Sequence, residues 1–293
     1  MKLVMFGERY QERPGVIIDD RLILDLEIPE LESPHSLEEL LEFNLLPELD
    51  ELIAHRGKLP LIPLESVRLG PPLAGLGKII AVGLNYREHI REMSDATPPN
   101  PLLFAKAATS LAGPYDALML PPAEWAREID YEVELGVVIG HLCHRVAVAD
   151  ALAYVAGYTI VNDITARDVQ RAESQWFRAK SYDGFCPIGP FLVTADEVID
   201  AHGLSLSTRV NGEIRQQSNT DQMLYSVPEL VSFISQSMTL LPGDIIATGT
   251  PSGIGAGMTP PTYLQPGDLL ELSIDGLGQQ RYTVVSFHDD EMP

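Results

Sequence analysis

Short apolar runs separated by turns rich in Gly and Pro recur along the chain, which predicts many short strands. The clearest alternation spans residues 129–139, and residues 158–161 form a run rich in β-branched side chains. Successive side chains of a strand point to opposite faces, so the first run would bury one apolar face: Tyr131, Val133, Leu135, Val137 and Ile139. Asn211-Gly212 between two further runs is typical of a hairpin. Other strand candidates are 16–18, 22–24, 78–82, 245–247 and 269–272.

Helical spacing is less common. In residues 36–56, leucines recur at helical intervals after Ser36 and Glu39, which fit a capping box. Thr165 and Asp168 resemble a second capping box and predict a short helix over 165–173. Further helices are predicted near 86–93, 148–154 and 227–237.

Prolines 60, 63, 71 and 72 mark an extended connector, and we place a domain boundary after residue 74. The expected organisation is a small N-terminal accessory domain, 1–74, and a larger domain, 75–293. The balance of elements predicts a β-rich α+β fold.

Composition narrows the class of protein. The 293 residues carry a net charge of −22, which argues against partners that bear phosphates, such as nucleic acids and anionic membranes. No apolar run reaches 18 residues, so we expect no transmembrane helix, and the N-terminus is too short in apolar length for a signal peptide. Cys143 and Cys186 cannot build a disulfide framework. A reducing, cytoplasmic location is therefore expected.

Three acids stand out against these patterns. Glu132 and Glu134 fall on the face of their strand opposite the apolar one, with Gly136 leaving space beside them, and Asp163 follows the run 158–161. Side-by-side acids repel unless a cation lies between them, and three carboxylates suit Mg²⁺ or Mn²⁺ better than zinc. The alternative is a solvated strand face and a turn residue.

Other residues could act beside such an ion. His89 and Glu92 would share a helical face, where the carboxylate would orient the imidazole as a general base; the alternative is an exposed ion pair. Lys180 could bind a substrate carboxylate or enolate oxygen, or lie on the surface. The loop 247–255 could form an anion-binding nest from its N–H groups and hydroxyls. His141-Leu142-Cys143-His144 lacks a second ligand pair at a fitting distance, which disfavours zinc.

Taken together, several segments resemble the fumarylacetoacetate hydrolase family, in order and spacing, over roughly residues 75 to 275. The matching segments are Gly83-Leu84-Asn85-Tyr86 with His89 and Glu92, then 130–140, 157–168, Ala179-Lys180-Ser181, 210–213 and 243–253. One departure is Leu84, where many members have Arg or Lys. Residues 1–70 look like the accessory domain of many bacterial members but match no sharp motif.

The resemblance implies a mixed β-sandwich roll that works as a homodimer, with Mg²⁺ or Mn²⁺ held by Glu132, Glu134 and Asp163. It implies that His89 and Glu92 form a dyad on a segment that closes over the site, and that Lys180 contacts the 2-oxo acid end of the substrate. The remaining expected substrate contacts are Thr250, Gly249, Arg87, Arg167 and Gln170.

These parts fit several reactions of a small 2-oxo or 1,3-dicarbonyl acid that pass through a metal-stabilised enolate. Hydrolysis of an acylpyruvate or decarboxylation of oxaloacetate is the leading expectation. An isomerase, a tautomerase, or a dehydratase acting on a dienoic or sugar-derived acid is the alternative. A metal-bound scaffold dimer with little turnover is a third possibility.

Overall fold

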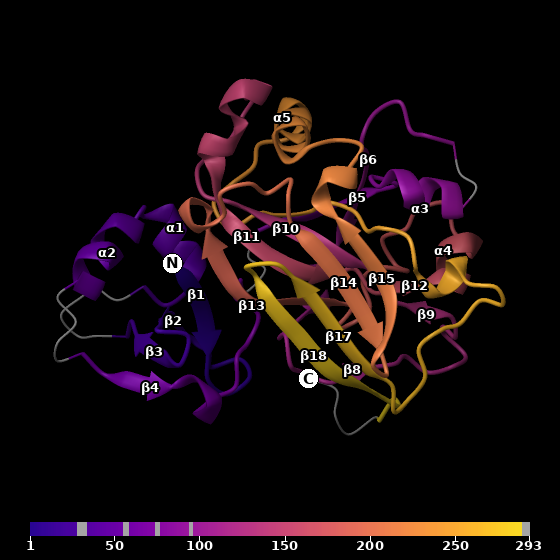
Figure 1. Cartoon of the computed structure of the whole chain (residues 1–293), viewed down its shortest axis with the longest axis horizontal. Coiled ribbons are helices and arrows are strands. Elements are labelled where there is room, and N and C mark those ends of the chain that lie inside the picture. The colour runs from indigo at the N-terminus through magenta and orange to yellow at the C-terminus, as the bar shows by residue number, and fades with distance from the viewer. Residues whose placement is uncertain (28–33, 55–58, 74–76, 94–95, 289–293) are drawn as a thin grey trace.

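The computed structural model describes residues 1–27, 34–54, 59–73, 77–93 and 96–288 (Figure 1). Its largest unit is an 11-stranded mixed sheet in the order β4-β3-β2-β1-β13-β11-β10-β16-β5-β6, with β7 paired to β13. The strands are β1 (Lys2–Phe6), β2 (Arg13–Ile18), β3 (Leu22–Asp25), β4 (Leu61–Pro63), β5 (Ile79–Gly83), β6 (Leu102–Lys106), β7 (Leu111–Ala112), β10 (Val133–Ile139), β11 (Val155–Asn162), β13 (Cys186–Thr194) and β16 (Ile245–Ala247).

A five-stranded sheet, β15-β14-β17-β18-β8, lies across the large sheet, and β9 pairs with β12 (Figure 1). These strands are β8 (Leu118–Met119), β9 (Ile129–Asp130), β12 (Thr165–Ala166), β14 (Ser205–Val210), β15 (Glu213–Asn219), β17 (Leu269–Ile274) and β18 (Gly278–Val285). The β-rich α+β class and the mixed, sandwich-like architecture predicted from the sequence are confirmed.

Two apolar clusters hold these layers together. Between the two sheets, Val133, Leu135 and Val137 of β10 pack with residues of the smaller sheet such as Leu270 and Leu272. Val138, from the opposite face of β10, belongs to a second cluster that includes residues of β1 to β3 and of α1. Because both faces of β10 are covered, the acids on this strand are buried, and the solvated-face alternative is wrong.

The helices are α1 (Leu37–Glu42), α2 (Leu46–Ala54), α3 (Arg87–Glu92), α4 (Arg167–Ala172) and α5 (Val227–Ser237). Short 3₁₀ turns are η1 (Leu64–Ser66), η2 (Ala108–Ser110), η3 (Val148–Tyr154), η4 (Ala195–Glu197), η5 (Thr220–Gln222) and η6 (Gly255–Gly257). The predictions near 86–93 and 227–237 are confirmed as α-helices, whereas 148–154 is a 3₁₀ turn. Among the described residues, no helix combines the length and apolar character needed to cross a bilayer.

Two helix predictions need correction. The single helix expected over 36–56 is interrupted, because Asn44 adopts a left-handed conformation between α1 and α2, and its last two residues fall outside the described ranges. The capping box at Thr165 is also wrong. Thr165 belongs to β12 and donates its hydroxyl to the Asp163 carbonyl at 2.9 Å, and Ala166 is the N-cap of α4. The capping bond from the Glu39 N–H to Ser36 is present at 3.2 Å.

The N-terminal strands continue the sheet of the larger segment. Lys2 and Leu3 of β1 pair with Val193 and Leu192 of β13, so β1 to β4 extend the sheet at one end (Figure 1, indigo to purple). The division into domains 1–74 and 75–293 stays a prediction.

Candidate active site and metal centre

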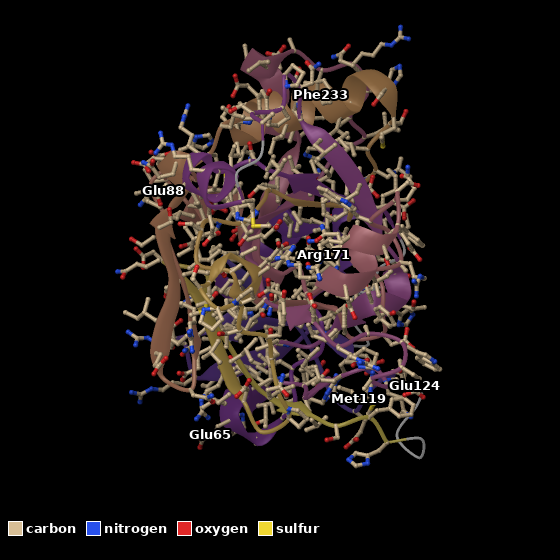
Figure 2. The ribbon with its side chains drawn as sticks, turned by 90° about the vertical axis from the view of Figure 1, so that its right-hand side faces the viewer. Glu65, Glu88, Met119, Glu124, Arg171 and Phe233 are labelled. Atoms are coloured by element: carbon tan, nitrogen blue, oxygen red, sulfur yellow. The ribbon has the colours of Figure 1, made fainter. Side chains whose placement is uncertain are left out.

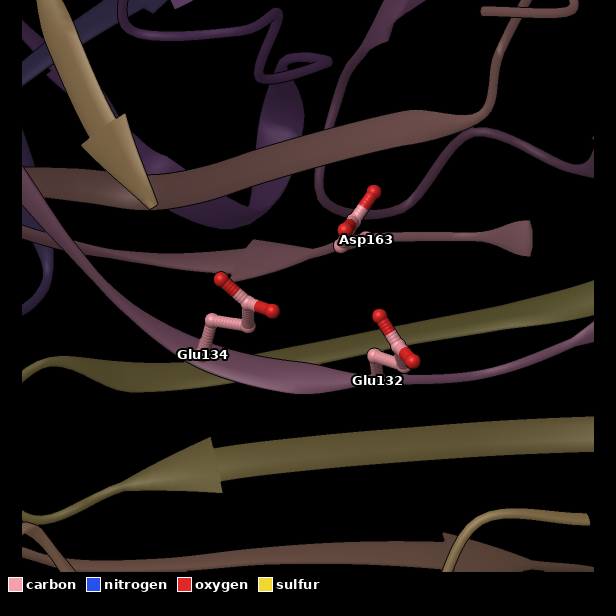
Figure 3. Close-up of side chains that lie close together, drawn as sticks. All are labelled: Glu132, Glu134 and Asp163. Atoms are coloured by element: carbon pink, nitrogen blue, oxygen red, sulfur yellow. The ribbon is translucent and has the colours of Figure 1, made fainter. Parts of the chain in front are cut away.

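Glu132, Glu134 and Asp163 form a buried cluster in which one carboxylate oxygen of each lies within 4.8 Å of the others (Figure 3). Glu134 lies on β10 and Glu132 directly precedes it, and the alternation of the extended chain directs both glutamates to one side. Pairing of Val133 with Asn162 then brings the end of β11 alongside, and the Asp163 N–H donates to the Glu132 carbonyl at 2.9 Å. The sequence-predicted trio is therefore brought together.

Gly136 does not leave the space that we expected beside these acids. A Cβ atom at this position would lie 2.7 Å from Val161 and 2.9 Å from Thr159 of the neighbouring strand. The glycine therefore permits close packing of β10 on β11.

Three buried cations surround the acids. Lys180 Nζ lies 2.6 Å from both Glu132 and Asp163, so it is not a surface lysine. Lys106 Nζ lies 2.7 Å from the other oxygen of Asp163 and also donates to the Lys180 carbonyl. Arg167 bridges Glu132 at 2.6 Å and Asp130 at 2.9 Å. With Glu134, the cluster has four carboxylates against three cations, which leaves an excess negative charge for a bound ion to offset.

The acids titrate unequally because their neighbours differ. Burial, with the charges of Asp163 and Glu132, raises the pKa of Glu134 well above its ordinary value. Burial also acts to raise the pKa of Glu132, but Arg167 and Lys180 outweigh it, and that pKa is lowered. For Lys180, burial is opposed by Asp163 and Glu132, and the pKa is raised, which keeps the ammonium charged at neutral pH. The uncompensated group is Glu134, whose repulsion a divalent cation would relieve.

The donor set fits a hard divalent cation. All three candidate ligands are carboxylates, and hard ions such as Mg²⁺ and Mn²⁺ prefer oxygen donors. Hydrogen bonds from neighbouring groups orient these carboxylates. One example is the Gly249 N–H, which donates to Glu134 at 2.8 Å. Groups that hold a ligand in this way commonly support a metal site.

His89 and Glu92 also pair as predicted. On α3 the His89 Nδ1 atom lies 3.2 Å from Glu92 Oε2, and the imidazole is buried against the cavity beside the acids. The other Glu92 oxygen accepts the Gly253 N–H at 2.9 Å. The pair is therefore held on two sides and is not an exposed helical ion pair.

Four N–H groups of the loop after β16, which we predicted as an anion-binding nest, donate to the protein's own carboxylates. Gly249 donates to Glu134, Gly253 to Glu92, and both Gly255 and Ala256 to Asp130, at 2.7 and 3.0 Å. The Thr250 hydroxyl donates to the Val133 carbonyl at 3.0 Å. This loop therefore positions the acids.

The cavity next to the cluster has a volume of about 190 Å³. Thr250, Gln170 and Arg167 line it, whereas Gly249 is not among its lining residues. Arg87 does not line it either. Its side chain is exposed and donates to the Met223 carbonyl at 3.2 Å. Figure 2 shows the face at the right of Figure 1, with Arg171 of α4, a further lining residue, near its centre.

Sequence reasoning missed four residues that shape this site: Lys106, Asp130, Phe104 and Trp176. The chain has five lysines, so the position of Lys106 at the end of an apolar strand was a usable signal. Asp130 lies inside the matching segment 130–140, but nothing local indicates that it binds Arg167. The two aromatic residues carry no local signal.

Comparisons with known proteins agree with this geometry. Residues 78–285 match the family described as Fumarylacetoacetate (FAA) hydrolase C-terminal. The chain is 43% identical over 292 residues to 2,4-didehydro-3-deoxy-L-rhamnonate hydrolase of a Sphingomonas strain, covering 97% of this chain and 96% of that protein. It is 41% identical over 285 residues to the mitochondrial oxaloacetate tautomerase Fahd2a of Rattus norvegicus, covering 95% and 90%.

Solved structures resemble the whole chain. A fumarylacetoacetate hydrolase from Exiguobacterium antarcticum is 39% identical with a TM-score of 0.86, covering 98% of this chain and 100% of that one. Maleylpyruvate hydrolase from Sphingobium, solved with manganese(II) and pyruvate, is 31% identical with a TM-score of 0.80 over the same shares.

Proposed function

Because the chain belongs to the fumarylacetoacetate hydrolase family, we propose that it is a divalent-metal-dependent enzyme that hydrolyses a C–C bond of a small 2-oxo or 1,3-dicarbonyl acid. Its relatives are hydrolases, isomerases and tautomerases of small acids, and the chain is an enzyme of this broad kind. The observation that carries the proposal is one cavity with the acid cluster, a buried ammonium group and the His89–Glu92 pair.

Glu132, Glu134 and Asp163 would hold the ion, Mg²⁺ or Mn²⁺. When bound, it would polarise the carbonyl groups of a 2-oxo acid and favour the enolate that C–C cleavage leaves. The manganese and pyruvate in the maleylpyruvate hydrolase structure support this assignment. The hydrolase relative acts on an acid whose name places oxidised carbons at positions 2 and 4, as in a 1,3-dicarbonyl.

Two side chains of the protein would handle the proton and the charge that develop in this reaction. His89, oriented by Glu92, takes a proton from water, which adds to the acyl carbonyl. Lys180, kept charged by Glu132 and Asp163, stabilises negative charge on the neighbouring oxygen. For acetylpyruvate, water adds across the C3–C4 bond, and the products are acetate and pyruvate. Thr250 and Gln170 are the expected substrate contacts at the cavity wall.

A second candidate is tautomerisation of oxaloacetate, favoured by the 41% identity to a tautomerase over 95% of this chain. It requires proton transfer between carbon and oxygen without addition of water, and His89 and Lys180 could provide it. Decarboxylation of oxaloacetate would use the same enolate. A homodimer, which the family resemblance implies, stays a prediction.

One assay separates these reactions. Metal-stripped protein is incubated with acetylpyruvate or oxaloacetate, with and without Mg²⁺ or Mn²⁺, and followed by absorbance and mass spectrometry. We expect acetate and pyruvate from acetylpyruvate only when the ion is present. Metal-dependent keto–enol conversion of oxaloacetate with acetylpyruvate unchanged would favour the tautomerase, and pyruvate with CO₂ from oxaloacetate would favour the decarboxylase.

A further inference from the structure

The two ends of the cavity differ in chemistry. Glu134 lies on β10, Glu132 directly precedes it, and Asp163 directly follows β11. The other end is built from β5, β6 and neighbouring segments, which lie beyond β16 in the sheet. Its side chains are apolar: Val82, Leu84, Met93, Phe104 and Trp176. A ligand held at the acid end would therefore extend its other end onto an apolar wall.

The wall is closely packed. The rings of Phe104 and Trp176 meet edge to face, with centroids 5.3 Å apart. Gly83 allows this approach, because a Cβ atom there would lie 2.7 Å from Cζ3 of Trp176. Phe104 also marks the border with the polar end, since Lys180 Nζ lies 5.0 Å from its ring centroid. The wall thus offers a defined apolar surface to the short tail of a ligand.

Every lysine or arginine among the described lining residues already has a carboxylate partner. Lys180 is held by Glu132 and Asp163, and Arg167 by Asp130 and Glu132. Arg171, at the exposed rim, pairs with Glu128. A second carboxylate at the far end of a substrate would lose its hydration without gaining an unpaired cation, which is unfavourable.

The volume of the cavity indicates how much of that far end it can enclose. A cavity of about 150 Å³ holds a benzene molecule, and this cavity, at about 190 Å³, is only slightly larger. We propose that the site selects 2-oxo acids with a single carboxylate and a short, uncharged tail that packs on Leu84, Phe104 and Trp176. This inference rests on the proposed function for the end that the ion holds. Within that function it favours acylpyruvates with small acyl groups over oxaloacetate.

The test uses unreactive oxamates, so that binding is measured apart from turnover. N-propyl oxamate and N-(2-carboxyethyl) oxamate differ in a terminal methyl or carboxylate, and each is titrated calorimetrically into Mn²⁺-loaded protein. We expect the propyl compound to bind at least tenfold more tightly. Equal affinities, a preference for the carboxylate, or no binding of either compound would overturn the inference.

Substitutions in the apolar wall test whether it causes the preference for the propyl compound. Leu84→Arg should place a cation in the wall and reduce the propyl preference at least tenfold, whereas the neutral control Leu84→Gln should not improve binding of the carboxylate compound. Gly83→Ala, which pushes on Trp176, should weaken propyl binding and leave Mn²⁺ affinity unchanged. A preference unaffected by both Leu84→Arg and Gly83→Ala would overturn the assignment to this wall.

The two proposals can fail separately. Propyl preference without turnover of acetylpyruvate would refute hydrolysis and support the tail-binding wall. Metal-dependent turnover without the preference would refute only the tail-binding wall.

Discussion

Glu134→Gln should stabilise the metal-free protein while removing its response to metal. The substitution keeps the shape of the side chain and an oxygen that can accept the Gly249 N–H, now 2.8 Å from Glu134 Oε2. It removes a charge that lies within 4.8 Å of Glu132 and Asp163. The result would show that this position serves ion binding at the expense of stability.

The magnitude follows from the charges. At 4.8 Å and an effective dielectric constant of about 20, two carboxylates repel by roughly 3.5 kcal/mol, and Glu134 has two such neighbours. Attraction to Lys180 and the Gly249 hydrogen bond offset part of this repulsion. We therefore expect Glu134→Gln to raise the free energy of unfolding by about 1 to 3 kcal/mol at neutral pH, which corresponds to about 2 to 4 °C in Tm per kcal/mol.

The effect should depend on pH in a defined direction. Because folding raises the pKa of Glu134 above its ordinary value of 4.5, its proton is held more tightly in the folded protein. The stabilisation from this proton is complete below the ordinary pKa and is lost as pH rises through the raised one. The advantage of Glu134→Gln over metal-free wild type should therefore grow as pH increases above about 4.5.

The assay is urea unfolding of chelator-treated protein over a range of pH, repeated with Mn²⁺. Wild type should gain about 2.7 kcal/mol at an ion concentration of 100 times its dissociation constant, and Glu134→Gln much less. Glu271→Gln, whose partner Arg281 is exposed, is the control and should change stability by about 0.5 kcal/mol or less. A destabilised Glu134→Gln that still responds fully to Mn²⁺ would refute the reasoning.

Three further substitutions test the remaining roles. His89→Ala should abolish acetylpyruvate hydrolysis and leave Mn²⁺ affinity unchanged, and retained hydrolysis would remove the dyad from the mechanism. Asp163→Ala should weaken Mn²⁺ binding in calorimetry by about tenfold or more, a loss seen even for groups that only support a ligand; full affinity would contradict its assignment. Lys106→Met breaks a fully buried pair and should cost about 3 to 5 kcal/mol in urea unfolding. Lys2→Met, which breaks an ion pair at the surface, should leave the free energy of unfolding nearly unchanged. Equal losses for the two variants would show that burial does not set the cost.

The shared side of Glu132 and Glu134 could be predicted because its cause is local. The two-residue period of a strand places Glu132 and Glu134 on one side whatever the rest of the chain does. Asp163 follows directly from the end of the next strand, which pairs with the first. The His89–Glu92 pair is equally local, since the helical spacing of three residues brings the side chains together.

The surroundings of these acids depend on tertiary structure. Lys106 is 57 residues from Asp163 in sequence, and the Gly249 N–H is 115 residues from Glu134. No periodicity connects such positions. The small polar residues after β16 fit either a nest that binds substrate or a loop that holds carboxylates. The sequence cannot distinguish the two, because the partners of their N–H groups come from distant segments of the chain. The same is true of Gly83, whose role depends on Trp176.

The net charge of the chain affects how strongly the site can bind an anionic substrate. With a net charge of −22, the protein repels an anionic substrate at long range, and the site itself has four carboxylates against three cations. Its lysines and arginine already offset three of those carboxylates, so that the site as a whole keeps an excess of negative charge. A bound divalent cation would turn the excess of one negative charge into an excess of one positive charge. Affinity for the anionic end of the proposed substrate therefore depends on the ion, whereas the apolar wall acts without it, so that ion and wall select different ends of one molecule.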